Sequence, residues 1–173
     1  MDFYCRALQV ADFSEFYSMM QEFTRFEGIH HLLLPKSDLQ EKLLGPLAKA
    51  KGVLLCEQQT GQIAGLLLMS VVDYNVCYHR RPALYLEEIY IKPELRGYSL
   101  GKKLMQVASQ YALEQGCDRL EGVVIRGNLL AQGFHKKMGA QTLGYFDPIQ
   151  YDLEAIEKML APHESPPIEI TVL

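Results

Sequence analysis

The chain has 173 residues, 49% of them hydrophobic and 22% charged, which is ordinary for one globular domain. Its formal net charge of −4 provides no basic footprint for nucleic acid, so we expect no nucleic-acid partner. The N-terminus lacks the pattern of a signal peptide, and the longest apolar run, residues 63–72, is far too short to span a bilayer. We therefore expect a cytoplasmic protein with no membrane partner.

The cysteines indicate neither a metal site nor a disulfide framework. Cys5, Cys56, Cys77 and Cys117 form no C-x-x-C pair, and no histidine cluster has the spacing of zinc ligands. We expect reduced thiols and no bound metal.

The first half of the chain predicts strands and two early helices. Residues 3–8 predict a strand, Asp12 then caps a helix with an apolar stripe, and a short helix starts at Ser37. Residues 52–58 and 62–72 predict two strands that a Thr60-Gly61 turn joins as a hairpin. A polar loop over 73–83 leads to a strand over 84–91, which ends before Pro93.

The second half alternates strands and helices. Residues 99–115 predict the best-defined helix, 120–125 a strand, and Asn128 caps a helix that ends at Gly139. A strand near 149–153 and a helix over 154–160 follow. We expect an α/β (α+β) fold with a mixed central sheet of about six or seven strands flanked by helices, as a single domain over residues 1–160. The tail, residues 161–173, is proline-rich and then strand-like, which leaves open whether it adds a strand.

The turn before the long helix has the chemistry of an anion site. Glycines in Arg96-Gly97-Tyr98-Ser99-Leu100-Gly101 let the backbone bend, and the unpaired amides and positive dipole of a helix N-terminus attract a pyrophosphate. Arg96, Lys102 and Lys103 add positive charge. A plain helix start with a convenient glycine turn is the alternative interpretation.

Three motifs in order carry a family resemblance. The turn resembles the [Arg/Gln]-x-x-Gly-x-[Gly/Ala] acetyl-CoA motif of the GNAT superfamily of N-acetyltransferases, with Ser99 where the family has its middle glycine and where we expect a serine to cap the helix. Residues 84–91 look like that family's fourth strand, and Asn128 with residues 134–140 resembles its last helix. The similarity is closest to the diamine (spermidine/spermine) acetyltransferase branch.

The resemblance implies a place for acetyl-CoA, as co-substrate. It puts the pantetheine arm beside the fourth strand, the pyrophosphate on the turn, and the other end of the cofactor near the last helix. The residues that these three parts imply are Ile89, Tyr90 and Ile91; Arg96, Gly97, Tyr98, Ser99, Leu100, Gly101 and Lys102; and Asn128 and Ala131.

Acetylation of an ammonium requires a group that takes its proton, and Glu87 is the leading candidate. On a regular strand Glu87 lies among apolar residues, which desolvates the carboxylate and raises its pKa, while Glu88 points to the opposite face. A solvated strand end that merely exposes both acids is the alternative. In the resemblance, Glu87 matches the base and Glu88 a substrate-binding acid.

The proton donor and the acceptor are less constrained. His135 stands where the family has a tyrosine acid, and an imidazolium can donate a proton to a thiolate, although a helical histidine is also a common surface or packing residue. Glu27 resembles a substrate-lining acid, and Asp73 and Glu88 can join it around an amine. The nearby Arg80 and Arg81 suit a carboxylate-bearing acceptor or a merely solvated turn.

These residues predict an enzyme that moves acetyl from acetyl-CoA to a primary amine of a small molecule, such as a polyamine, diamine or amino acid, in a ternary complex. A catalytically weak acyl-CoA-binding module and a protein lysine or N-terminal acetyltransferase remain open alternatives. We also expect a homodimer.

Overall fold

The computed structural model describes residues 2–74, 77–144 and 151–160. They belong to two compact units, Met1–Met138 and Gly139–Leu173, and each unit is considered by itself. The first contains the sheet and the candidate site. In the second, the helix α5 spans Leu153–Leu160. Among the described residues, no helix is long and apolar enough to cross a membrane.

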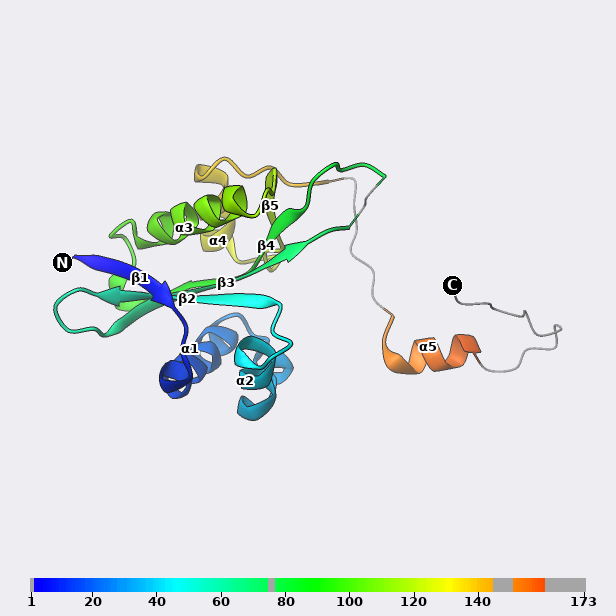
Figure 1. Cartoon of the computed structure of the whole chain (residues 1–173), viewed down its shortest axis with the longest axis horizontal. Helices are drawn as coiled ribbons and strands as arrows, with labels where there is room; N and C mark the ends of the chain where they lie inside the picture. The colour runs from blue at the N-terminus through cyan, green and yellow to red at the C-terminus, as the bar shows by residue number, and fades with distance from the viewer. Residues whose placement is uncertain (1, 75–76, 145–150, 161–173) are drawn as a thin grey trace. The chain divides into compact units, whose positions relative to one another are not determined.

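The first unit is built on a sheet whose strands lie in the order in which they occur in the sequence (Figure 1). These are β1 (Phe3–Ala7), β2 (Ala50–Glu57), β3 (Ile63–Val72), β4 (Ala83–Ile91) and β5 (Arg119–Gly122). The pairs from β1 to β4 are antiparallel, which confirms the β2–β3 hairpin, whereas β5 runs parallel to β4. A parallel pair needs a crossover, which α3 (Leu100–Glu114) supplies.

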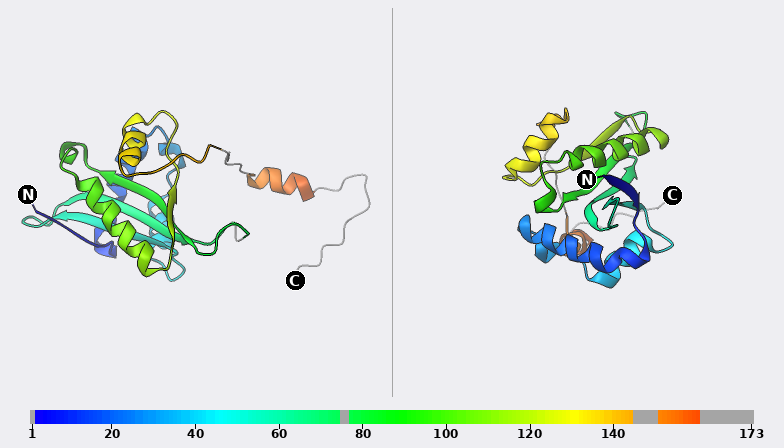
Figure 2. Two further views of the ribbon diagram at one scale, coloured as in Figure 1. Left: turned by 90° about the horizontal axis from the view of Figure 1, so that it is seen from above. Right: turned by 90° about the vertical axis from the view of Figure 1, so that its left-hand side faces the viewer.

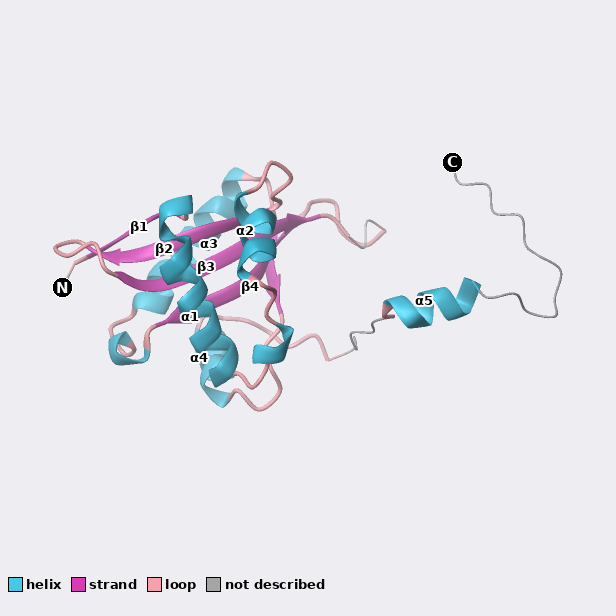
Figure 3. Ribbon diagram, turned by 90° about the horizontal axis from the view of Figure 1, so that it is seen from below, coloured by secondary structure: helices cyan, strands magenta, loops and turns pink. Residues whose placement is uncertain are grey.

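Helices cover both faces of the sheet (Figures 2 and 3). α1 (Phe13–Phe26) and α2 (Lys36–Leu44) lie on one face and α3 on the other, while α4 (Leu129–Lys137) follows β5. Short 3-10 helices span Val10–Asp12, His30–Leu32 and Pro93–Leu95. The mixed α/β fold class is therefore confirmed.

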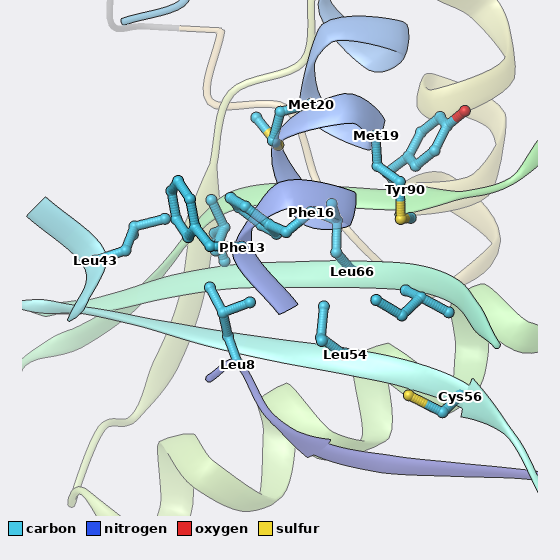
Figure 4. Packing of buried hydrophobic residues seen from close by; sticks show 12 residues of the cluster. Leu8, Phe13, Phe16, Met19, Met20, Leu43, Leu54, Cys56, Leu66 and Tyr90 are labelled. Carbon is cyan, nitrogen blue, oxygen red and sulfur yellow. The ribbon is translucent and has the colours of Figure 1, made fainter. Parts of the chain in front are cut away.

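β3 is the centre of both cores, since its side chains are buried from Ile63 to Ser70. Leu66 and Leu68 pack toward α1, in the cluster drawn in Figure 4, and Leu67 and Met69 pack toward α3. Where the pairing is regular, a residue of β2 or β4 lies on the same face as its partner on β3. Because both faces of β3 are buried, nearly all residues from 63 to 70 are hydrophobic.

The structure corrects several sequence-based boundaries. The described residues form five strands rather than six or seven, and β5 ends at Gly122, before the predicted limit of 125. In the strand predicted over 149–153, Tyr151 and Asp152 have no strand structure and Leu153 begins α5, while 149–150 lie outside the described residues. The tail over 161–173 also lies outside them.

Two predicted caps differ in their bonding. Asp12 occupies the N-cap position of α1, but its carboxylate accepts hydrogen bonds from Arg6 at 2.6 and 2.7 Å and from the Gln9 amide instead of capping α1. Ser99 occupies the N-cap of α3 and its hydroxyl makes no capping bond. Both residues therefore stand at the N-cap positions that the sequence indicated, but neither side chain makes the capping hydrogen bond.

Candidate active site

A β-bulge in β4 determines how the two adjacent glutamates are presented. Leu68 of β3 pairs with Glu88 and the next residue, Met69, pairs with Leu86, so Glu87 has no partner residue on β3. Such an extra residue interrupts the alternation of side chains along a strand. Leu86 accordingly packs on the α3 side, and Ile89, three residues later, packs on that side again.

The bulge brings Glu87 and Glu88 to the face of α1. The Ser70 hydroxyl, which follows Leu68 on that face, donates a hydrogen bond of 2.6 Å to Glu87 Oε1. Glu88 alternates with Tyr90, which belongs to the α1-side core. The prediction that the two acids point to opposite faces, with Glu87 beside Ile89 and Ile91, is therefore wrong.

A third carboxylate reaches the same place from the end of α1. Glu27 is the residue that follows α1, and Asn128 Nδ2 donates a hydrogen bond to its Oε1. Glu27 and Glu87 both act electrostatically on Glu88. The structure thus brings three of the predicted site residues into one acidic cluster, defined by Glu27, Glu87 and Glu88.

Burial distinguishes the members of this cluster. Glu87 is exposed, whereas Glu88 is half-buried. Desolvation, followed by repulsion from Glu27 and Glu87, raises the pKa of Glu88 to about 7. Tyr85 lies near both acids, and its phenol pKa is raised by burial and by their charges. The desolvated carboxylate is consequently Glu88 rather than the predicted Glu87.

β4 also has an edge that no strand covers. Its pairing with β5 ends at Leu86 and Gly122, so residues 87–91 have no strand partner on that side among the described residues. Ile89 and Ile91 pack toward α3, whereas Tyr90 packs toward α1. An extended chain bearing amides, such as pantetheine, can bond to a free strand edge of this kind.

The turn between β4 and α3 has the unpaired donors that a diphosphate requires. The amides of residues 97–102 have no acceptor within the described part of the chain, whereas Arg96 and Lys103 on either side donate to Pro93 and Ser99. Gly97 and Ser99 both have positive φ values, of 89° and 60°. These conformations turn successive amides outward at a helix N-terminus, which suits an anion. The residues present therefore fit the diphosphate of a coenzyme.

A hollow of about 620 Å³ lies at this turn and reaches β1. Its walls include Phe3, Tyr98, Ser99, Leu100, Lys102, Lys103 and Gln106. Lys103 Nζ donates to the Phe3 carbonyl at 2.8 Å. Lys102, which also lines the hollow, is exposed.

Two residues of the turn between β4 and α3, Arg96 and Gly101, make contacts within the protein itself. Arg96 Nε donates to the Ile91 carbonyl at 3.1 Å, and its guanidinium lies 5.0 Å from the ring centre of Phe26 and 5.7 Å from that of Tyr90. Arg96 thus fastens the turn to the end of α1. Gly101 leaves room for the Phe134 ring, since a Cβ there would lie 3.0 Å from Phe134 Cε2.

α4 places the last predicted residues. Asn128 caps α4 as predicted, since its Oδ1 accepts a bond of 2.9 Å from the Ala131 amide. The Ala131 amide and the Asn128 side chain are therefore engaged within the protein. His135 is half-buried beside Phe134, with ring centres 5.1 Å apart, and burial lowers its pKa. A lowered pKa leaves less imidazolium at pH 7 than an exposed histidine has.

Asp73 lies apart from the acidic cluster. Val72, at the end of β3, pairs with Ala83, which precedes Glu88 by five residues, or about 16 Å of strand. Asp73 instead lines a hollow of about 470 Å³ in the β3–β4 loop with Cys77, Tyr78, His79 and Arg80. The structure therefore does not bring Asp73 together with Glu27 and Glu88.

Sequence reasoning missed Ser70 and Tyr85. Ser70 is only 9% exposed, and it is the one hydroxyl in the apolar run 63–72. A buried hydroxyl needs a hydrogen-bond partner, so this serine was a detectable signal for a polar group across the sheet. Tyr85 precedes the acids by two and three positions, but nothing in the sequence marks its role.

The first unit thus combines a turn with outward amides, a strand edge without a strand partner and a cluster of three carboxylates. The sequence model of the acetyltransferase (GNAT) family matches residues 14–140, and the chain belongs to this family. Members of the family take the acetyl group from acetyl-CoA.

Named relatives are similar over different shares of the chain. Thialysine N-epsilon-acetyltransferase of Bos taurus is 42% identical over 78 residues, which cover 42% of this chain and 46% of that protein. The Mus musculus protein of the same name is 27% identical over 150 residues, covering 80% and 84%. L-ornithine N5-acetyltransferase of Arabidopsis thaliana is 33% identical over 61 residues, covering 35% and 27%. The chain thus matches less than half of the bovine protein's length and most of the mouse protein's.

Solved structures share the fold. An integron cassette protein from V. cholerae has a TM-score of 0.73 at 15% identity, covering 94% of this chain and 99% of that chain. Identity this low supports the fold alone.

Proposed function

We propose that this chain is an N-acetyltransferase that moves the acetyl group of acetyl-CoA to a primary amine of a small molecule within a ternary complex. The observation that carries the proposal is the acidic cluster, which the bulge presents on β4 where that strand loses its β5 partner. Acetyl-CoA supplies an activated thioester when bound.

Three parts of the site would bind three parts of the reactants. The outward amides of residues 97–102 and the charge of Lys102 bind a diphosphate. The β4 edge at residues 89–91 orients the extended arm. Glu27, Glu87 and Glu88 attract an ammonium, whose pKa of roughly 10.4 means that a proton must be removed before the nitrogen can attack.

A small acceptor with a terminal amine agrees with the relatives' names. Thialysine N-epsilon and ornithine N5 are both terminal amines of amino acids. The loop arginines Arg80 and Arg81 precede Ala83, the first residue of β4, which is itself about 16 Å of strand from Glu88, and neither is among the charges that shift the pKa of Glu88. Polyamines, diamines and basic amino acids are therefore the acceptors to test.

The test is a thiol-release assay with acetyl-CoA and a panel of spermidine, a diamine, lysine, thialysine, ornithine and a lysine-containing peptide. We expect at least one small amine to be acetylated, and the double variant Glu87→Gln/Glu88→Gln to lose roughly 100-fold or more of kcat/KM. Glu114→Gln, at an exposed acid of α3 outside the site, is the matched control and should keep the parent rate.

Two results would contradict the proposal. If acetyl-CoA raises the unfolding temperature while no acceptor releases thiol, the chain is an acyl-CoA-binding module. If only the peptide is acetylated, it is a protein acetyltransferase.

A further inference from the structure

The three carboxylates of the acidic cluster differ in their hydrogen bonds. This difference indicates which of them bind a cation and which can take up a proton. Glu87 is exposed and its Oε1 accepts the 2.6 Å bond from Ser70, a side chain 9% exposed on the rigid central strand β3. One oxygen is thereby fixed in direction, and the other accepts no hydrogen bond from the described residues. This is the arrangement of an anchor for a cation rather than of a group that must lose and regain a proton.

Glu27 is held in a comparable way from a different element. Asn128 Nδ2 donates to its Oε1, while Asn128 Oδ1 is committed to the Ala131 amide of α4. An amide that bridges two elements can offer the carboxylate only its N–H side. Glu27 is thus a second acceptor whose orientation the protein sets.

Glu88 has no comparable donor among the described residues, although it is half-buried, as Glu27 is, whereas Glu87 is exposed. The groups that face it are Glu27 from the end of α1, and Glu87 and Tyr85 from β4 itself. The next polar group along β4, the Tyr90 hydroxyl, donates to Glu22 at 3.3 Å and is not directed to Glu88. Two negative neighbours and partial burial both favour the protonated form of this carboxyl.

We infer that Glu88 is the group that takes the proton of the acceptor ammonium, and that Glu87, positioned by Ser70, and Glu27, positioned by Asn128, hold that ammonium. This inference rests on the function proposed above and reverses the roles that the family resemblance implies for Glu87 and Glu88. The step is a proton transfer in which an N–H bond of R–NH₃⁺ breaks and its electron pair stays on nitrogen. An O–H bond forms on Glu88, leaving R–NH₂ and a neutral carboxyl.

The pH dependence of kcat/KM tests the assignment, because it reports the ionisation of the free enzyme. In the parent we expect a limb that rises with pH, with its midpoint near pH 7 and a plateau above it, since Glu88 must be ionised to act as a base. Glu88→Gln should lose this limb together with roughly 100-fold or more of kcat/KM, and Glu88→Asp should recover part of the rate.

Variants of the neighbours separate positioning from catalysis. Glu27→Gln removes a negative neighbour of Glu88, so the limb should remain and move to lower pH. Ser70→Ala and Glu87→Gln should mainly raise KM for the amine and keep the rising limb, which in Glu87→Gln should also move to lower pH because that variant removes the other negative neighbour of Glu88. A merely structural role for Ser70 would lower stability without such a split between KM and kcat.

A second readout needs no activity. In ¹³C NMR of the glutamate side chains without coenzyme, one carboxyl should titrate near pH 7 in the parent, be missing in Glu88→Gln and titrate lower in Glu27→Gln. Circular dichroism establishes that each variant is folded, and if Glu88→Gln is not, Glu27→Gln alone decides by the direction of its shift.

The inference is overturned if the limb survives in Glu88→Gln and disappears in Glu87→Gln, or if no glutamate titrates near pH 7. A parent with the predicted titration but no acetyl transfer to any amine would instead contradict the proposed function.

Discussion

Ser99 is the only non-glycine residue with a positive φ in the described part of the chain, at 60°. A side chain in this left-handed region costs about 1–2 kcal/mol, which glycine avoids. Its neighbour in the same turn, Gly97, has a φ of 89° and carries no such cost. The protein therefore keeps a strained serine where the turn directs its amides outward, as strained residues at functional sites often do.

Replacing Ser99 by glycine should stabilise the protein. The relief of about 1–2 kcal/mol exceeds the extra unfolded-state entropy of glycine, about 0.5–1 kcal/mol, so the free energy of unfolding should rise by about 0.5–1 kcal/mol. Urea denaturation measures it. Gly97→Ala is the matched control, because open space surrounds Gly97 and only its backbone conformation opposes a side chain. It should lose about 0.5–1 kcal/mol, because the same two terms act with the opposite sign. A loss of stability in Ser99→Gly would show that its hydroxyl contributes more than its backbone costs.

At the scale of single residues, the sequence singled out three acids that the structure brings together, but it did not predict the face on which the β4 acids lie. The pair Glu87 and Glu88 was identifiable, because adjacent acids in an apolar strand need an explanation. Their common face was not, because a bulge depends on the register between β3 and β4 and no residue type in β4 marks it. The desolvated member was misassigned for the same reason.

The packing of α4 against α3 depends on the absence of a side chain at Gly101. A Cβ there would lie 3.0 and 3.2 Å from two ring carbons of Phe134, closer than carbon atoms pack. α4 also carries Asn128, whose amide holds Glu27. The contact between α3 and α4 therefore links the position of the turn over residues 96–101 to the position of Asn128, which holds Glu27 of the acidic cluster.

Gly101→Ala should accordingly displace α4. We expect a loss of about 1–3 kcal/mol in the free energy of unfolding, the usual effect of overpacking, together with a lower rate of acetyl transfer. Gly133→Ala is the matched control in α4, since nothing lies within 4 Å of the added carbon. Alanine favours a helix interior over glycine by about 0.5–1 kcal/mol, so this variant should gain stability. Equal effects of the two substitutions would contradict the packing argument.

Elements were predictable where their pattern is local. The β2–β3 hairpin follows from Thr60-Gly61 between apolar runs, and α3 follows from its apolar stripe. β5 was predicted too long, because residues 123–125 are apolar yet exposed beyond Gly122. Hydrophobic residues alone do not distinguish a strand from a loop at a sheet edge.

In the first unit as a whole, a negatively charged region and an anion-attracting region lie on different faces of the sheet. One face of its sheet, under α1, carries the acidic cluster, and the start of α3 on the other face carries outward amides with Lys102. The fold class could be predicted from the order of strands and helices, because α3 is the crossover that a parallel strand requires. The strand count could not, since the apolar pattern near 151–153 predicted a strand where the described residues lead into α5.

The account's central claim is that the 97–102 amides and the β4 edge hold the coenzyme beside the acidic cluster. The most direct test is to titrate the ¹⁵N-labelled chain with acetyl-CoA and follow every backbone amide by NMR. We predict that the largest shifts fall on residues 89–91 and 97–102. Unchanged amides in both segments at saturating acetyl-CoA, or the largest shifts elsewhere in the chain, would contradict the claim.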